Sequence, residues 1–139
     1  MADIRQVTGD FAVASQLTLA DFEEMKRLGF ARVINNRPDG EAPGQPTSAQ
    51  AEAAAKAAGL GYVHAPFVGR PTAAAVDAAA KPGGPTLAYC RSGTRSINAW
   101  AVSQAKCGGM TADDIVKAAE VAGYDLSGLK DALRQLGAR

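Results

Sequence analysis

Short apolar runs alternate with segments of helical periodicity along most of the chain. The runs at residues 4–7 and 11–14 are separated by a polar turn and predict a small hairpin. Three further apolar runs, at residues 31–35, 62–65 and 86–89, predict additional strands.

Helical spacing of apolar residues occupies the intervals between these strands. The first helix is expected after Thr18, a candidate N-cap, and is expected to end at Gly29. Further helices are expected from Thr47 or Ser48 to Gly59, from Thr72 to about residue 80, after the strand at 86–89, from Thr111, and over residues 126–136.

Strands that alternate with helices predict an α/β fold in which a central, mostly parallel sheet is flanked by helices on both faces. Ligands of such folds bind at the carboxyl ends of the strands. Three predicted loops leave these ends, at residues 36–40, at residues 66–71 and from Cys90 onward. We therefore expect the three loops to meet over one pocket.

Length, net charge and the numbers of cysteine and histidine exclude several classes of function. The 139 residues are expected to form a single domain, 1–139, and the net charge of +1 gives no electrostatic case for a nucleic-acid partner. No basic cluster indicates a membrane surface, and the first residues lack a signal-peptide core, so a cytoplasmic protein is expected. With one histidine and two cysteines, neither a metal site, a cofactor nor a disulfide framework is expected.

Residues 90–96, Cys-Arg-Ser-Gly-Thr-Arg-Ser, carry the strongest chemical signal. A loop that opens a helix presents free N–H groups to an anion, and the helix N-terminus together with nearby arginines favours a thiolate. This pattern predicts Cys90 as a nucleophile and Arg95 as a two-pronged anion donor. The cradle would be formed by Arg91, Ser92, Gly93 and Thr94, with the Arg91 side chain beside the pocket. The simpler alternative is a buried cysteine that ends a core strand.

Four other side chains near the expected pocket are candidates, each with a structural alternative. Asp39 is a candidate general acid or a turn residue. Arg37 and Arg70 are candidate ligands of an anionic substrate or solvated loop arginines. Ser96 is a candidate hydrogen-bond donor to the Cys90 thiolate or a residue that caps the following helix.

The sequence resembles a family that combines two kinds of cysteine enzyme. Four residues separate Cys90 from Arg95, as in rhodanese-type sulfurtransferases, whereas cysteine-dependent phosphatases have five. Residues 33–41, residues 43–46 and residues 87–96 are similar to the signatures of small bacterial beta-lactamase-hydrolase-like phosphatases or sulfur transferases. The resemblance implies a three-layer sandwich like that of protein tyrosine phosphatases, in particular the dual-specificity type.

Two departures from related phosphatases lead us to place sulfur transfer first. The loop at 66–71 lacks the aspartate acid that the resemblance implies, and Tyr89 stands where phosphatases usually have histidine. The first interpretation is a sulfurtransferase that moves a sulfane sulfur from a small anionic donor, through a Cys90 persulfide, to a protein or low-molecular-weight thiol. The alternative is a phosphatase that hydrolyses a phosphorylated substrate through a Cys90 phosphocysteine, with Arg95 on the anion and Asp39 as acid. A non-enzymatic alternative is an anion- or phosphoprotein-binding module.

Overall fold

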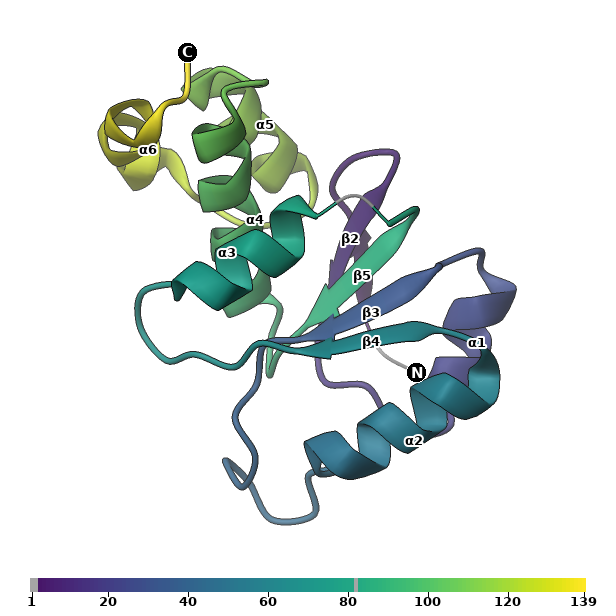
Figure 1. Ribbon diagram of the computed structural model, residues 1–139. Helices are drawn as coiled ribbons and strands as arrows, with labels where there is room; N and C mark the ends of the chain where they lie inside the picture. The colour runs from purple at the N-terminus through teal and green to yellow at the C-terminus, as the bar shows by residue number, and fades with distance from the viewer. Residues whose placement is uncertain (1–2, 82) are drawn as a thin grey trace.

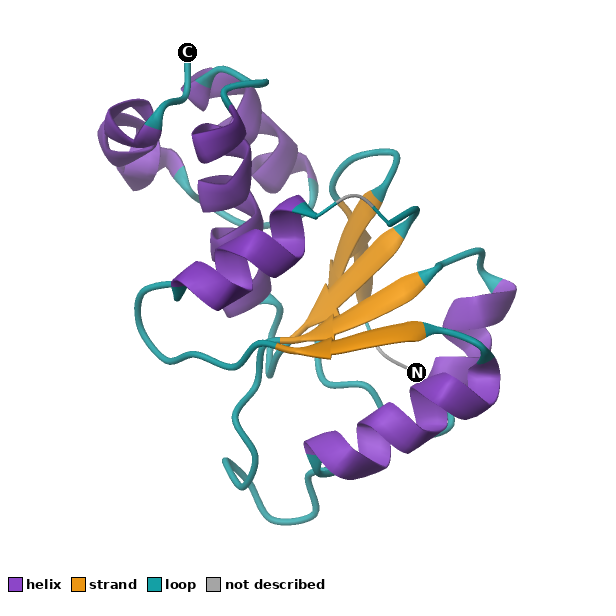
Figure 2. Cartoon of the chain, in the orientation of Figure 1, coloured by secondary structure: helices purple, strands orange, loops and turns teal. Residues whose placement is uncertain are grey.

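The computed structural model describes residues 3–81 and 83–139 and is built around a five-stranded sheet (Figures 1 and 2). The strands lie side by side in the order β1-β2-β5-β3-β4. They are β1 (Ile4–Gln6), β2 (Phe11–Ala14), β3 (Arg32–Asn35), β4 (Gly61–His64) and β5 (Thr86–Tyr89). β1 and β2 form the predicted antiparallel hairpin, and all other neighbours in the sheet are parallel.

The register of the parallel strands brings three chain segments to one edge of the sheet. Tyr89, the last residue of β5, pairs with Asn35 at the end of β3, and Asn35 pairs with His64 at the end of β4. The loops that follow these three strands therefore leave the sheet together, as the sequence predicts.

Helices cover both faces of the sheet, and this confirms the predicted α/β three-layer architecture (Figure 1). The helices are α1 (Asp21–Arg27), α2 (Ser48–Ala58), α3 (Ala73–Ala80), α4 (Thr94–Cys107), α5 (Ala112–Val121) and α6 (Lys130–Leu136), with a short 3-10 helix at Ser127–Leu129. α1 and α2 pack on one face, and α3 to α6 pack on the other. Within the described part of the chain, none of these helices has the length and apolar character needed to cross a membrane.

β5 contributes to the cores on both faces, because alternate side chains of a strand point to opposite sides. Ala88 packs with Trp100 of α4 in the core beneath α3 to α6. Leu87 and Tyr89 belong to the core beneath α1 and α2. The strand that leads to Cys90 is therefore held from both sides.

The start of α1 differs from the sequence prediction. The helix begins at Asp21, and the Asp21 carboxylate accepts the backbone N–H of Thr18 at 2.8 Å. Thr18 is thus bound by the acidic residue and does not itself cap the helix. α2 does begin as predicted, with Thr47 and Gln50 forming a reciprocal capping box.

Candidate active site

Cys90 lies between β5 and α4, at the carboxyl edge of the sheet. Its side chain is 1% exposed, and its Sγ accepts the backbone N–H of Gly93 at 3.1 Å. Gly93 has a φ of +90° and immediately precedes α4, which begins at Thr94. The positive φ is one that glycine adopts without steric cost, and it turns the loop back so that this N–H points at the sulfur. The predicted order of strand, loop and helix is confirmed.

Arg95, in the first turn of α4, forms a two-pronged ion pair with Glu41 from the loop after β3. Its Nη1 and Nη2 each donate to a Glu41 carboxylate oxygen at 2.8 Å. Nη1 also donates to the carbonyl oxygen of Phe67 at 3.3 Å, in the loop after β4. Arg95 therefore joins all three loops that the sequence predicts to meet.

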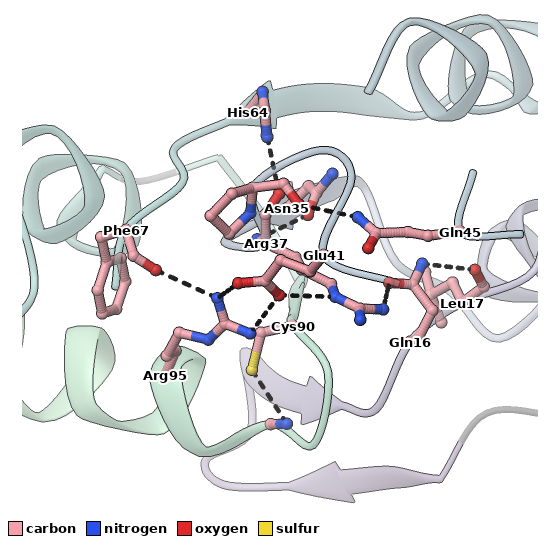
Figure 3. Close-up of polar contacts among 12 residues, drawn as sticks. Gln16, Leu17, Asn35, Arg37, Glu41, Gln45, His64, Phe67, Cys90 and Arg95 are labelled. Atoms are coloured by element: carbon pink, nitrogen blue, oxygen red, sulfur yellow. Dashed lines mark hydrogen bonds and ion pairs between the residues drawn. The ribbon is translucent and has the colours of Figure 1, made fainter. Parts of the chain in front are cut away.

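Arg37 approaches the same carboxylate from the other side. Its Nε donates to Glu41 at 2.9 Å, and its Nη1 donates to the side-chain oxygen of Gln16 at 2.9 Å. Figure 3 shows the Glu41 carboxylate between the guanidinium groups of Arg37 and Arg95, with the Cys90 side chain beside them. Arg37 is only 4% exposed, so this cation is part of the built site and is not a solvated loop residue.

The charges of this cluster shift the titration of its members. Hydrogen bonding to Arg95, more than any other favourable contact, lowers the pKa of Glu41 to about 2, and Arg37 adds to the effect. The Glu41 hydrogen bond in turn raises the pKa of Arg95, and the interaction with Cys90 contributes in the same direction. The site thus holds two guanidinium groups against one permanent carboxylate, next to a thiol.

Glu41 is the residue of this cluster to which the sequence analysis assigns no role. One signal was available, because Glu41 follows Arg37 by four residues within a loop that leaves the functional edge of the sheet. Asp39, the carboxylate named as candidate acid, is exposed, and its Oδ1 accepts the backbone N–H of Ser48 at 2.8 Å. In this structure Asp39 holds the start of α2, and the carboxylate that contacts Arg95 is that of Glu41.

Ser96 does not make the predicted hydrogen bond to Cys90. Its buried Oγ donates to Oδ1 of Asn36 at 2.8 Å. Asn36 in turn donates from Nδ2 to the carbonyl oxygen of Ala65 at 3.0 Å, and its N–H binds the carbonyl oxygen of Tyr89. Ser96 therefore links α4 to the ends of three strands. The predicted contact with Cys90 is replaced because Ser96 finds a partner, Asn36, that lies 60 positions away in the sequence.

The side chains of the remaining candidates, Arg91, Ser92, Thr94 and Arg70, lie at the surface. Arg91 is exposed, and only its backbone carbonyl has a partner among the described residues, the N–H of Gln16. The hydroxyl groups of Ser92 and Thr94 lie 3.1 Å apart on the outside of the loop. Arg70 is exposed and lines a groove of about 650 Å³ between α3, α4 and α6. Across the described residues there is no cluster of three or more His, Cys, Asp or Glu side chains suited to a metal ion.

Comparison with known proteins identifies the family. Residues 3–107 match the phosphatase-like domain of beta-lactamase hydrolase-like proteins. The beta-lactamase hydrolase-like protein of Agrobacterium fabrum is 38% identical over 119 residues, which cover 82% of this chain and 28% of that protein. A relative of the same name from Xylella fastidiosa is 36% identical over 120 residues, again 28% of its length. The chain thus spans little more than a quarter of the relatives that it matches.

Solved structures agree with this match. The crystal structure of a candidate phosphatase from Neisseria meningitidis has a TM-score of 0.78 and 33% identity, and the similarity covers 96% of this chain and 97% of that one. A candidate phosphatase from Shewanella putrefaciens has a TM-score of 0.72 at 19% identity, over 98% of this chain and 93% of that one. PTPMT1, at 16% identity and a TM-score of 0.71, shares the fold.

These findings favour the phosphatase alternative over sulfur transfer, which the loop length and the missing acid had placed first. The resemblance drawn from the two sequence signatures is confirmed, as is the expected phosphatase-like sandwich. The fold and the matched family domain are both phosphatase-like. The chain belongs to the family of phosphatase-like domains found in beta-lactamase hydrolase-like proteins.

Proposed function

We propose that this chain hydrolyses phosphate monoesters in two steps through a phosphocysteine at Cys90. In the first step Sγ attacks phosphorus, the S–P bond forms, and the ester P–O bond breaks to release the alcohol, which takes up a proton. In the second step water attacks phosphorus, the S–P bond breaks, and inorganic phosphate leaves. The observation that carries the proposal is the hydrogen bond from the Gly93 N–H to the Cys90 sulfur at the start of α4, in whose first turn Arg95 lies.

The donors of Arg95 support phosphate binding. A guanidinium has five N–H groups. Two N–H groups of Nη1 and one of Nη2 serve Glu41 and Phe67. Among the described residues the Nε–H and the second Nη2–H have no hydrogen-bond acceptor, and they lie on the same edge of the planar group. This edge is the fork that binds two phosphate oxygens at once. Arg95 can therefore bind a phosphate while it keeps its contact with Glu41.

Glu41 positions this fork and does not supply a proton. With a pKa of about 2, its carboxylate stays ionised under ordinary conditions. An ionised carboxylate accepts hydrogen bonds only, so it can orient Arg95 and Arg37 but cannot protonate a leaving group. Its negative charge also opposes a second anion, which limits how tightly the site holds free phosphate.

The leaving group then decides which phosphate esters react. The loop at residues 66–71 contains no Asp, Glu or His, and Asp39 is bound to the start of α2. General acid catalysis typically contributes about 10²- to 10⁴-fold. We therefore propose that the preferred substrates have leaving groups that depart without protonation, such as aryl phosphates, over simple alkyl phosphates.

Intact mass spectrometry and turnover test this proposal together. Incubation with an aryl phosphate should give a phosphate adduct on Cys90 and Cys90-dependent release of the phenol. The matched control is Cys107→Ser, since Cys107 is exposed at the far end of α4 and should not affect turnover. A persulfide formed on Cys90 from thiosulfate, without any hydrolysis of aryl phosphate, would reject the proposal in favour of sulfur transfer.

A further inference from the structure

The peptide group between Ser92 and Gly93 is held at both of its polar ends. Its N–H donates to Sγ of Cys90 at 3.1 Å, and its carbonyl oxygen accepts the hydroxyl of Tyr124 at 3.0 Å. The C=O and N–H of a trans peptide point in opposite directions in one plane. The Tyr124 hydroxyl therefore fixes the orientation in which the N–H faces the sulfur.

Tyr124 reaches the loop from the turn that ends α5, far from Cys90 in the sequence. Gly123 has a φ of +100°, and the Tyr124 N–H returns to the carbonyl oxygen of Ala119 at 2.8 Å. Arg5 of β1 donates to the carbonyl oxygen of Ala122 at 3.4 Å, which ties this turn to the edge of the sheet. The Tyr124 ring packs against the core beneath α3 to α6. The position of the Tyr124 hydroxyl is thus fixed both by the contacts of the turn and by the packing of the ring.

The fit between Tyr124 and Gly93 is close enough to exclude a side chain from the loop. A Cβ at Gly93 would lie 2.1 Å from the Tyr124 hydroxyl oxygen, well inside any allowed contact. Glycine is therefore required at position 93 for two reasons: the loop needs a positive φ, and the Tyr124 ring needs the space that a side chain would fill.

The phenol is kept in the protonated form that this contact needs. Burial raises the pKa of Tyr124, and the nearby Cys90 raises it further, while Arg5 opposes the shift. A protonated hydroxyl can donate to the Ser92 carbonyl, whereas a phenolate would repel it.

We propose that Tyr124 is a positioning residue for the Cys90 loop, which it serves by holding the Ser92–Gly93 peptide with its N–H toward the sulfur. Without the hydroxyl, rotation of this peptide would turn a carbonyl oxygen toward the thiolate and toward any bound anion. Tyr124 lies beyond residues 3–107, the part of the chain that matches the family. The catalytic part of this inference rests on the proposed phosphatase function, but the geometry of the loop does not.

The test compares Tyr124→Phe with the wild type in the alkylation of Cys90 by iodoacetamide at fixed pH. We expect the alkylation rate and the protection by inorganic phosphate each to fall about three- to tenfold, the effect of losing one ordinary hydrogen bond. The Gly93 amide should also exchange faster with solvent by nuclear magnetic resonance. With an aryl phosphate, kcat should fall more than KM changes, while the unfolding temperature stays close to that of the wild type.

The matched control is Tyr62→Phe, which removes a hydroxyl bound to Asn35 and Ser48 on the other side of the sheet. This variant should alkylate at the wild-type rate. Wild-type alkylation, phosphate protection and Gly93 exchange in Tyr124→Phe would overturn the inference, as would an equal loss in Tyr62→Phe. Because alkylation needs no turnover, a wild type that hydrolyses no phosphate ester would reject the proposed function and leave this comparison intact.

Discussion

Glu41 and Arg95 face each other in a two-pronged ion pair, with both N–O distances at 2.8 Å, although 54 positions separate them in the sequence. The pair connects the loop after β3 to the first turn of α4. Because Glu41 also contacts Arg37, one carboxylate orients both guanidinium groups beside Cys90.

Replacing Glu41 with Gln should separate binding from catalysis. Loss of the negative charge leaves two cations for an incoming anion, so inorganic phosphate should inhibit more strongly. Loss of the Glu41 carboxylate that orients Arg95 should lower kcat by about tenfold, in line with the loss of a charge-assisted hydrogen bond. Steady-state kinetics with phosphate as inhibitor check both effects. The control is Glu52→Gln, which removes a carboxylate paired with Lys56 on the exposed side of α2. Weaker phosphate inhibition in Glu41→Gln would contradict this account.

The stability that Glu41 provides should depend on pH in an acidic window. Its pKa is about 2 in the folded protein and near the ordinary value of 4.5 in the unfolded chain. A lowered carboxylate pKa gives stability that is fully present above the ordinary value and is lost as the pH falls through the folded value. The difference in unfolding temperature between the wild type and Glu41→Gln should therefore be constant above about pH 5 and shrink toward pH 2. A difference that grew on acidification would be incompatible with the ion pair.

Ser96→Ala should reduce stability more than it reduces the chemistry. The Ser96 hydroxyl and the Asn36 side chain are both buried, so the substitution leaves Oδ1 of Asn36 without its donor. Such a loss costs about 1–3 kcal/mol. Denaturant unfolding measures this cost, and kcat for an aryl phosphate measures the chemistry. Arg95→Lys should show the opposite balance and reduce kcat more than stability, because lysine keeps the positive charge but lacks the two-pronged guanidinium edge. Full stability with lost turnover in Ser96→Ala would instead place Ser96 on the thiolate.

Asp39→Asn should leave the preference among leaving groups unchanged. Asp39 binds the N–H of Ser48 at the start of α2, where asparagine is also an effective acceptor. The ratio of kcat/KM for an alkyl phosphate to that for an aryl phosphate should therefore match the wild type. A selective loss for the alkyl phosphate would identify Asp39 as the general acid and refute the leaving-group preference proposed above.

The fold could be predicted from the sequence because its signals are local. Each of the strands β3, β4 and β5 is a short run with helical segments around it, and parallel pairing follows from that order. The position of Cys90 follows from the same logic, since it comes directly after the β5 run. The start of α1 was missed because Thr18 and Asp21 are both of residue types that cap helices. The backbone path decides which of the two side chains accepts a backbone N–H, and here it is that of Asp21.

The contacts within the site could not be predicted from the sequence, because they join distant segments. Ser96 has Cys90 nearby in the chain, yet its partner is Asn36 from another strand end. Glu41 stands in a stretch rich in proline and glycine that reads as a turn, and only the folded loop brings it to Arg95. Tyr124 carries no motif, and its contact with Ser92 depends on how α5 ends.

The burial of β5 between two cores has a consequence for how this scaffold can change over evolution or in the laboratory. Cys90, the proposed nucleophile, is anchored by a strand and a helix, whereas the groups proposed to meet the rest of a substrate come from the loops after β3 and β4. We expect exchange of residues 42–46 or 68–71 with those of relatives to leave the strand, α4 and the Glu41–Arg95 pair in place. On the proposed function, substrate preference can therefore diversify through loop grafts while the Cys90 sulfur and its support are inherited as one unit.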